Sequence, residues 1–271
     1  MKLSLKIMLA SLSLASLTSC SKNSPYAKDT TESSAETLKL DSKSDAIVIK
    51  AAGDIVPALE EFRGLLGTLN SAPNATGGRR EINWDAVPAA LTNNNLFPGD
   101  FFGSADPLAA NGRKRGLIST TPGNGFRISD TNFVDVKAEY GKLFKAFSPK
   151  KTFIANGSTI TDNFFKVPGT NVNASVRGFG VVFSGVNNGS STSLEFYDGD
   201  RLLGTFKVPN NGTSNVSGFS FVGVYFPNDK VTRVRINSGS APLSSTQDDL
   251  SDGGGKDVVI MDDFIYSEPR N

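Results

Sequence analysis

The sequence predicts a mainly β fold, a β-sandwich of jelly-roll-like or immunoglobulin-like topology with an N-terminal amphipathic helix and long ordered loops. Three observations lead to this prediction. Short apolar runs separated by turn residues fill the chain from about residue 151 onwards. Asp198-Gly199 lies between two of these runs and favours a tight hairpin. One earlier segment has helical periodicity, and seven short strands with one helix are most simply arranged as two packed sheets.

Residues 1–19 have the features of a secretory signal peptide. Lys2 and Lys6 supply a basic start, and the apolar run Leu5–Leu17 is shorter than the ~20 residues that a membrane-spanning helix needs. The run ends in Leu-Thr-Ser-Cys, which resembles the bacterial lipobox. We therefore expect cleavage before Cys20 and lipidation of Cys20. A plain signal peptide with an incidental cysteine is the alternative.

Lipidation of Cys20 predicts a protein of the bacterial cell envelope whose first partner is a membrane. Because Cys20 is the only cysteine, no intramolecular disulfide can form. Ser21 follows it, and by resemblance to the sorting rule of enteric bacteria this residue favours the outer membrane. Residues 20–45 are polar and almost free of large apolar side chains, which predicts a flexible tether. Residues 46–271 are then a single sandwich domain.

A short strand at Ala46–Ile49 and the amphipathic helix open the domain. Asp54 is suited to cap the start of the helix and Gly67 to end it. Its predicted buried stripe is Ile55, Leu59, Phe62 and Leu66. The rest of residues 46–147 is rich in Gly, Pro and Asn, which predicts long loops with short strands near Ile118 and at Phe126–Ile128.

Residues 148–271 contain the regular strands. They are predicted at Thr159–Val167, Val176–Val186, Ser193–Tyr197, Leu202–Val208, Phe219–Phe226, Val231–Asn237 and Asp257–Tyr266. In the sixth of these, Val234 and Ile236 alternate with Arg233 and Arg235, so one side is apolar and the other carries paired arginines.

Composition excludes several functions. The chain has no histidine, so Ser-His-Asp and Cys-His catalysis are excluded and a zinc site is disfavoured. Removal of residues 1–19 takes two lysines from the 28 basic residues and leaves 26 against 27 acidic ones. With no clustered basic face, we expect no nucleic-acid partner.

The stretch from Gly77 to Ala90, GGRREINWDAVPAA, holds the only tryptophan. Its strand-like alternation directs Ile82 and Trp84 inward, and Trp84 is predicted to be a packing anchor rather than a platform for sugar rings. Asp85 is predicted to cap a second, short helix, because Asp-x-Val-Pro-Ala repeats the start of the first. The candidate binding residues are Arg79, Arg80, Glu81, Asn83 and Trp84.

Without a bend in the chain between them, Glu81 and Asp85 do not fit a glycosidase pair, so at most one of them could act, with a partner from elsewhere. Four residues along a strand span ~13 Å, whereas such carboxyl pairs lie about 5 to 9.5 Å apart.

Two segments together resemble a known family. Gly78-Arg79-Arg80-Glu81-Ile82-Asn83-Trp84-Asp85 and Val259-Ile260-Met261-Asp262-Asp263-Phe264-Ile265-Tyr266 are similar to motifs of an uncharacterised family of secreted bacterial proteins. The resemblance covers about residues 50–269, although Ala86 and Ser267 stand where that family has glycine. It implies one integrated domain and leaves the activity open. The last strand is also analogous to strands of jelly-roll carbohydrate-binding modules.

The last predicted strand poses a second question. Asp262 and Asp263 should point to opposite faces, and the buried one needs an arginine, a backbone donor or a cation. Arg177, Arg233 and Arg235 are the candidate partners. The calcium alternative adds Asp248, Asp249, Asp252 and Asp257, which do not have EF-hand spacing. Asp257, Asp262 and Asp263 are therefore predicted to be structural or cation-binding.

The sequence favours a non-catalytic binding or structural module whose partner is a glycan or another envelope protein. A secreted polysaccharide-acting enzyme that uses carboxylates is the first alternative, and a scaffold subunit of an envelope assembly is the second.

Overall fold

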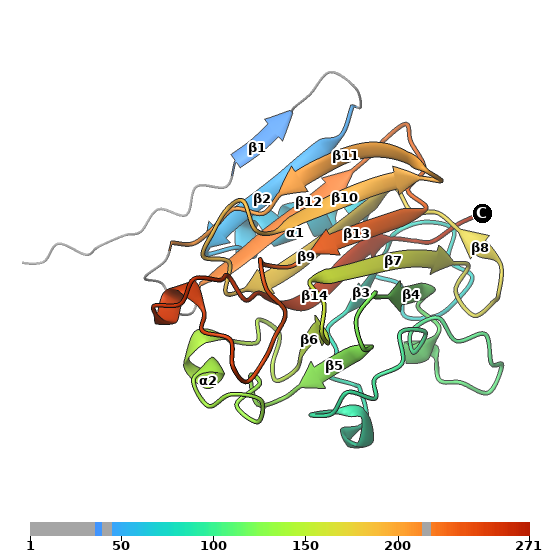
Figure 1. The fold of residues 1–271 in the computed structure, drawn as a ribbon. Helices are drawn as coiled ribbons and strands as arrows, with labels where there is room; N and C mark the ends of the chain where they lie inside the picture. The colour runs from blue at the N-terminus through green and yellow to red at the C-terminus, as the bar shows by residue number, and fades with distance from the viewer. Residues whose placement is uncertain (1–35, 40–44, 213–217) are drawn as a thin grey trace, which may run out of the picture. The chain divides into compact units, whose positions relative to one another are not determined.

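The computed structural model describes residues 36–39, 45–212 and 218–271, and these form two antiparallel sheets packed face to face (Figure 1). The first sheet has the order β1 (Glu36–Lys39), β2 (Ile47–Gly53), β12 (Phe219–Tyr225), β9 (Gly178–Ser184), β14 (Ile260–Ser267), β6 (Thr152–Ala155) and β5 (Phe126–Ser129), and β3 (Arg79–Ile82) also pairs with β14. The second has the order β11 (Arg201–Lys207), β10 (Ser193–Asp198), β13 (Arg233–Asn237), β7 (Ile160–Lys166) and β4 (Leu117–Thr120), and β8 (Asn173–Ala174) also pairs with β7. The predicted β-sandwich is confirmed.

Most strands fall where alternation and turn residues predicted them, and the additions are the strands β1, β6 and β8 and the helix α2. β6 was not predicted, because Thr152–Ala155 is buried on both faces and shows no alternation. The helix α2 (Tyr140–Leu143) is too short for a periodic signal. Residues 36–39, within the predicted tether, form the strand β1, which pairs with β2. The other residues of the tether, and Cys20, lie outside the described residues.

The main core lies between the two sheets and is rich in phenylalanine. Fully buried rings come from both layers, for example Phe183 and Phe264 from the first sheet and Phe196 from the second. Short 3-10 helices, η1 (Ala89–Leu91), η2 (Asn111–Arg113) and η3 (Leu250–Asp252), lie in the connecting loops. Within the described residues, no helix is long and apolar enough to cross a membrane.

The helix α1 (Val56–Leu66) packs on the outer face of the first sheet and covers it (Figure 1). Its predicted stripe is confirmed, because Ile55, Leu59, Phe62 and Leu66 are all buried. The carboxylate of Asp54 accepts a hydrogen bond from the N–H of Val56 at 3.1 Å, and Gly67 ends the helix with a φ of 92°.

Glycines in the two central strands make room for α1. A Cβ on Gly180 of β9 or on Gly223 of β12 would lie 2.8 or 2.7 Å from ring carbons of Phe62, which is closer than side chains tolerate. The bare backbone at these two positions allows the helix to sit directly on the sheet.

Candidate functional site

The two segments that carried the family resemblance pair with each other at β14. β3 pairs with its C-terminal half, where Ile82 lies opposite Phe264, and β6 pairs with its N-terminal end, where Phe153 lies opposite Met261. Between these partners, the pairing of β14 with β9 shifts register from Met261 to Phe264. Asp262 and Asp263 therefore lie at a break in the ladder, where their backbone groups need other partners.

Trp84, which follows β3 in the chain, provides a hydrogen-bond partner for the backbone at this break. Its indole N–H donates a hydrogen bond to the carbonyl oxygen of Asp262 at 2.7 Å, and its ring stacks on Phe153 with centroids 4.1 Å apart. The backbone of Trp84 has a φ of 66°, which is unusual for a bulky residue. The side chain is 2% exposed, which confirms that Trp84 is a packing anchor and leaves no ring face for a sugar.

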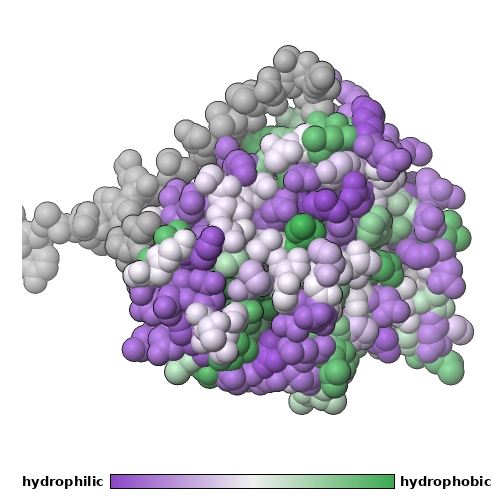
Figure 2. Space-filling model, viewed as in Figure 1, coloured by the Kyte–Doolittle hydropathy of each residue, from purple (hydrophilic) through white to green (hydrophobic). Residues whose placement is uncertain are grey.

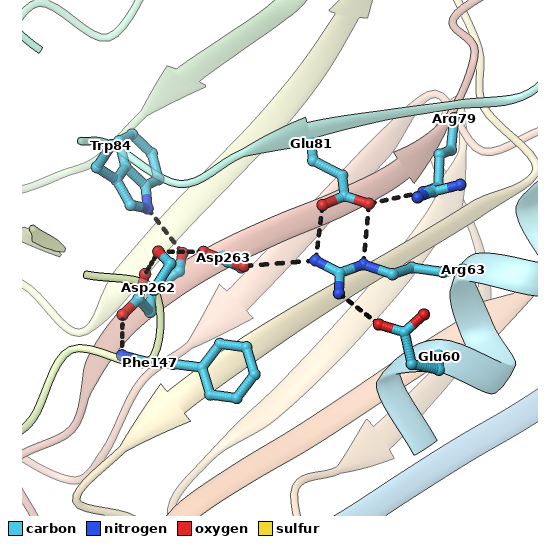
Figure 3. Close-up of polar contacts among 9 residues, drawn as sticks. Glu60, Arg63, Arg79, Glu81, Trp84, Phe147, Asp262 and Asp263 are labelled. Carbon is cyan, nitrogen blue, oxygen red and sulfur yellow. Dashed lines mark hydrogen bonds and ion pairs between the residues drawn. The ribbon is translucent and has the colours of Figure 1, made fainter. Parts of the chain in front are cut away.

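The two aspartates lie side by side instead of on opposite faces (Figure 3). The hydroxyl of Ser148 hydrogen-bonds to Oδ1 of Asp262 at 3.1 Å and to Oδ1 of Asp263 at 2.7 Å. The N–H of Phe147 donates to Oδ2 of Asp262 at 2.5 Å. The prediction of opposite faces is wrong because the irregularity in β14 breaks the two-residue alternation of side chains.

Burial makes this carboxyl pair weakly acidic. Loss of solvent and repulsion by Asp263 raise the pKa of Asp262 to about 9, so Asp262 holds its proton at neutral pH and is hydrogen-bonded to Asp263. Burial also raises the pKa of Asp263, although the Ser148 hydrogen bond and the charge of Arg63 oppose it. The arginine beside Asp263 is Arg63 of α1, whose Nη2 lies 3.8 Å from Oδ2 of Asp263. The expectation that Arg177, Arg233 or Arg235 supplies this charge is wrong.

Glu81 bridges the helix to β3. Arg63 holds both oxygens of Glu81, at 3.0 and 2.7 Å, and Nε of Arg79 lies 2.6 Å from Oε1 of Glu81. Burial by itself would raise the pKa of Glu81, but the hydrogen bonds from Arg63 and Arg79 outweigh burial and hold the pKa below its ordinary value. Arg63 also bonds Glu60 at 2.8 Å (Figure 3). A cluster of two arginines and three carboxylates thus joins α1, β3 and β14.

The candidate binding residues are mostly engaged inside the protein. Arg80 is fully buried and binds both oxygens of Glu268 at 2.7 Å, so it cannot meet a partner. Arg79 and Glu81 are half-buried in the cluster with Arg63, and only Asn83 is exposed. Glu81, Asn83 and Trp84 do border a pocket of about 280 Å³, together with Phe101 and Arg113. As a set, the predicted binding residues have a structural role, because most of them make contacts that join elements of the fold.

Asp85 has a different task from the predicted one. Its Oδ1 accepts the backbone N–H of Lys151 at 3.0 Å, which fixes the segment that leads into β6. The following turn is only the 3-10 helix η1, which begins after Pro88 and has no side-chain cap. The repeated Asp-x-Val-Pro-Ala therefore misled the prediction of a second capped helix.

Two buried aspartates of the acidic loop before β14 are hydrogen-bonded to backbone N–H groups. Asp257 is fully buried and accepts the N–H groups of Asn187 at 3.0 Å and Asn188 at 3.1 Å, and burial raises its pKa. Asp249 accepts the N–H of Val258 at 2.7 Å and caps η3 through Ser251. In the part of the chain that the structure describes, no group of three or more acidic, His or Cys side chains could hold a metal ion.

The outer face of the second sheet carries the paired arginines that the sequence predicted on β13. No helix lies over it in the described part of the chain, so we call this layer the open sheet (Figure 1). The strand register places one mixed row across its outer face: Leu202, Tyr197, Arg233, Phe164 and Ile118. Figure 2 views this face, where polar residues surround small hydrophobic areas.

Contacts with charged side chains fix the ring of Tyr197 and the guanidinium of Arg235 on this face. The guanidinium of Arg233 lies 3.8 Å from the ring centroid of Tyr197. Arg235 binds Asp162 through two hydrogen bonds of 2.9 and 2.8 Å, and the hydroxyl of Tyr197 donates to Glu195 at 2.5 Å. Phe164 is 38% exposed and Leu202 51% exposed, which is high for such large apolar side chains.

A pocket of about 540 Å³ lies at one end of this face. Phe164 and Arg233 line it from β7 and β13, Asn173 from β8, and Asp200 from the turn between β10 and β11. The alternation of Arg233 and Arg235 indicated this face, but its aromatic neighbours come from other strands. Their contact depends on strand order, which the sequence does not reveal.

No protein-family model, curated protein or solved structure matches this chain. The family resemblance stays a prediction.

Proposed function

We propose that this chain is a lipid-anchored protein of the bacterial cell envelope whose sandwich binds a glycan without catalysis. The observation that carries the proposal is the open sheet, with exposed Phe164, Arg233 stacked on Tyr197, and the adjoining pocket of about 540 Å³. Lipid attachment at Cys20 and an outer-membrane location rest on the N-terminal sequence.

The chemistry of this face suits a sugar. A pyranose presents an apolar C–H surface and a ring of hydroxyl groups, so it needs an aromatic contact beside hydrogen-bonding side chains. Phe164 offers the apolar contact, and Arg233, Asn173 and Asp200 offer donors and acceptors in the same pocket. Because Arg233 and Tyr197 already hold each other, little side-chain freedom is lost when a ligand binds.

The arrangement of the carboxylates favours binding over hydrolysis. Asp262 and Asp263 are at most 3% exposed, and Glu81 is held by two arginines, so these groups are poorly placed to meet a glycosidic bond. The alternative of a polysaccharide-acting enzyme is tested by incubating the protein with the same polysaccharides and assaying for released reducing ends or unsaturated products.

Affinity electrophoresis in gels that contain single polysaccharides tests the proposal. The full chain with Cys20→Ser, which removes the lipidation site, should be retarded in at least one gel. Phe164→Ala and Arg233→Ala should each weaken retention by about tenfold, the effect of losing ~1.4 kcal/mol from a central contact. Retention by no polysaccharide across a broad panel would contradict the proposal.

Matched controls separate a lost contact from a lost fold. Leu108 is 92% exposed in a loop, so Leu108→Ala removes an apolar side chain elsewhere. Arg113 lies 4.6 Å from the ring of Phe101, so Arg113→Ala removes an equivalent cation–π pair. Both controls should keep wild-type retention.

A further inference from the structure

A third pocket, of about 340 Å³, is rimmed by cations. It lies where the end of α1, the start of β9, the end of β12 and the end of β14 meet, and Arg177, Lys230 and Arg270 line it together with Leu65, Tyr225 and Glu268. Two backbone bridges bring these segments together. Ser175 pairs with Arg270, and Val176 pairs with Val231.

The positive charge of this pocket is not neutralised within the described residues. Arg177, Lys230 and Arg270 are exposed, and none of them has an ion pair there. The guanidinium of Arg177 donates to the carbonyl oxygen of Pro227, which is uncharged. The acid in the lining, Glu268, is bound through both of its oxygens by the buried Arg80 and accepts a further hydrogen bond from Asn70 at 2.8 Å. In the described residues, therefore, none of these three cations is paired with a carboxylate side chain.

We infer that this pocket binds the carboxylate of an acidic sugar, so that the ligand of the protein is an acidic polysaccharide. Arginine and lysine are the side chains that bind carboxylates through charge-assisted hydrogen bonds. Tyr225 and Leu65 give an apolar wall for a ring, and the hydroxyls of Ser175 and Ser267 lie in the same lining. This inference rests on the proposed glycan-binding function and names the class of glycan.

The position of the pocket fits a chain that is held at two places. Residues 173–174 and 232–233 line the pocket of the open sheet, and residues 175, 177 and 230 line the cationic pocket. The same two segments thus contribute to both pockets, and a polymer is the type of ligand that can occupy both. Linked occupation strengthens binding without additional contacts at either place.

A pair of polymers with the same backbone tests the inference. We would compare polygalacturonate with its fully methyl-esterified form by affinity electrophoresis of the full chain with Cys20→Ser. The acidic polymer should bind about tenfold more tightly, and this preference should shrink as the salt concentration rises. In the double variant Arg177→Ala/Arg270→Ala, the two polymers should bind alike.

Arg113→Ala/Lys142→Ala is the matched control, because it removes the same charge from exposed positions outside the pocket. It should keep the preference for the acidic polymer. Equal binding of both polymers to the unsubstituted pocket would overturn the inference and leave the proposed function standing. The inference would also be overturned if both double variants lost the preference for the acidic polymer equally. Failure of every polysaccharide in the wider panel would instead overturn the proposed function itself.

Discussion

At the scale of single residues, the decisive group is a carboxyl that does not ionise at neutral pH. Asp262 is buried beside Asp263, and the pKa of about 9 means that the folded protein holds a proton that the unfolded chain releases near pH 4. Above pH 4 the folded state therefore binds more protons than the unfolded state. Its free energy of unfolding must fall as the pH rises towards 9.

Asp262→Asn should remove this pH dependence. The amide imitates the protonated carboxyl, because it can accept from Phe147 and donate to Asp263. The contribution of one proton approaches about 1.4 kcal/mol per pH unit within the window from pH 4 to pH 9. Urea unfolding at pH 6, 7.5 and 9 should show wild type losing stability relative to the variant. Parallel curves for the two proteins would mean that Asp262 is ionised in the fold.

Arg80 should behave as a structural residue. Arg80→Ala leaves the buried carboxylate of Glu268 with only Asn70 as a hydrogen-bond partner, which should cost ~3–5 kcal/mol of stability. Arg79→Ala removes a partly buried pair but leaves Glu81 both of its hydrogen bonds from Arg63, so it should cost less, ~1 kcal/mol. Urea midpoints of the two variants give the comparison. If Arg80→Ala were the milder change and reduced ligand binding, the original prediction of a binding role would be restored.

At the scale of elements, the sequence predicted most strands and the helix because their signals are local. Alternation, turn residues and the stripe of α1 depend only on near neighbours in the chain. The joint at β14 was missed because its cause is a change of partner strand at Asp262 and Asp263, which only the sheet order reveals. For the same reason Arg79 and Glu81 looked available, since Arg63, which occupies them, lies on another element.

The seat of α1 on two glycines gives a prediction at this scale. Gly223→Ala places a methyl group against the ring of Phe62 and should destabilise the fold by ~1–3 kcal/mol. Gly64→Ala is the control, because a Cβ there meets nothing within 4 Å. It should stabilise the exposed helix by ~0.5–1 kcal/mol. Thermal unfolding of both variants measures these changes. If Gly223→Ala did not change the stability, the close contact between Phe62 and residue 223 would be contradicted.

At the scale of the whole molecule, we propose that a lipid on Cys20 anchors a sandwich that has one face covered by α1 and one open face. Cys20→Ser should move the protein from the membrane fraction to the soluble fraction of its cells, because the remaining N-terminal segment has no lipid to hold it. Detergent partitioning of cell lysates measures this. Continued membrane association of the variant would show that Cys20 is not the anchor.

The central claim is that the open sheet is where a glycan binds. Hydrogen–deuterium exchange with and without a saturating polysaccharide locates the contact directly. We expect slower exchange in β7, β10, β13 and the turn at Gly199-Asp200, and no change in β2 or in the first turns of α1, which line neither pocket. Protection confined to α1, β2 or the loops around Trp84, with the open sheet unchanged, would contradict the account.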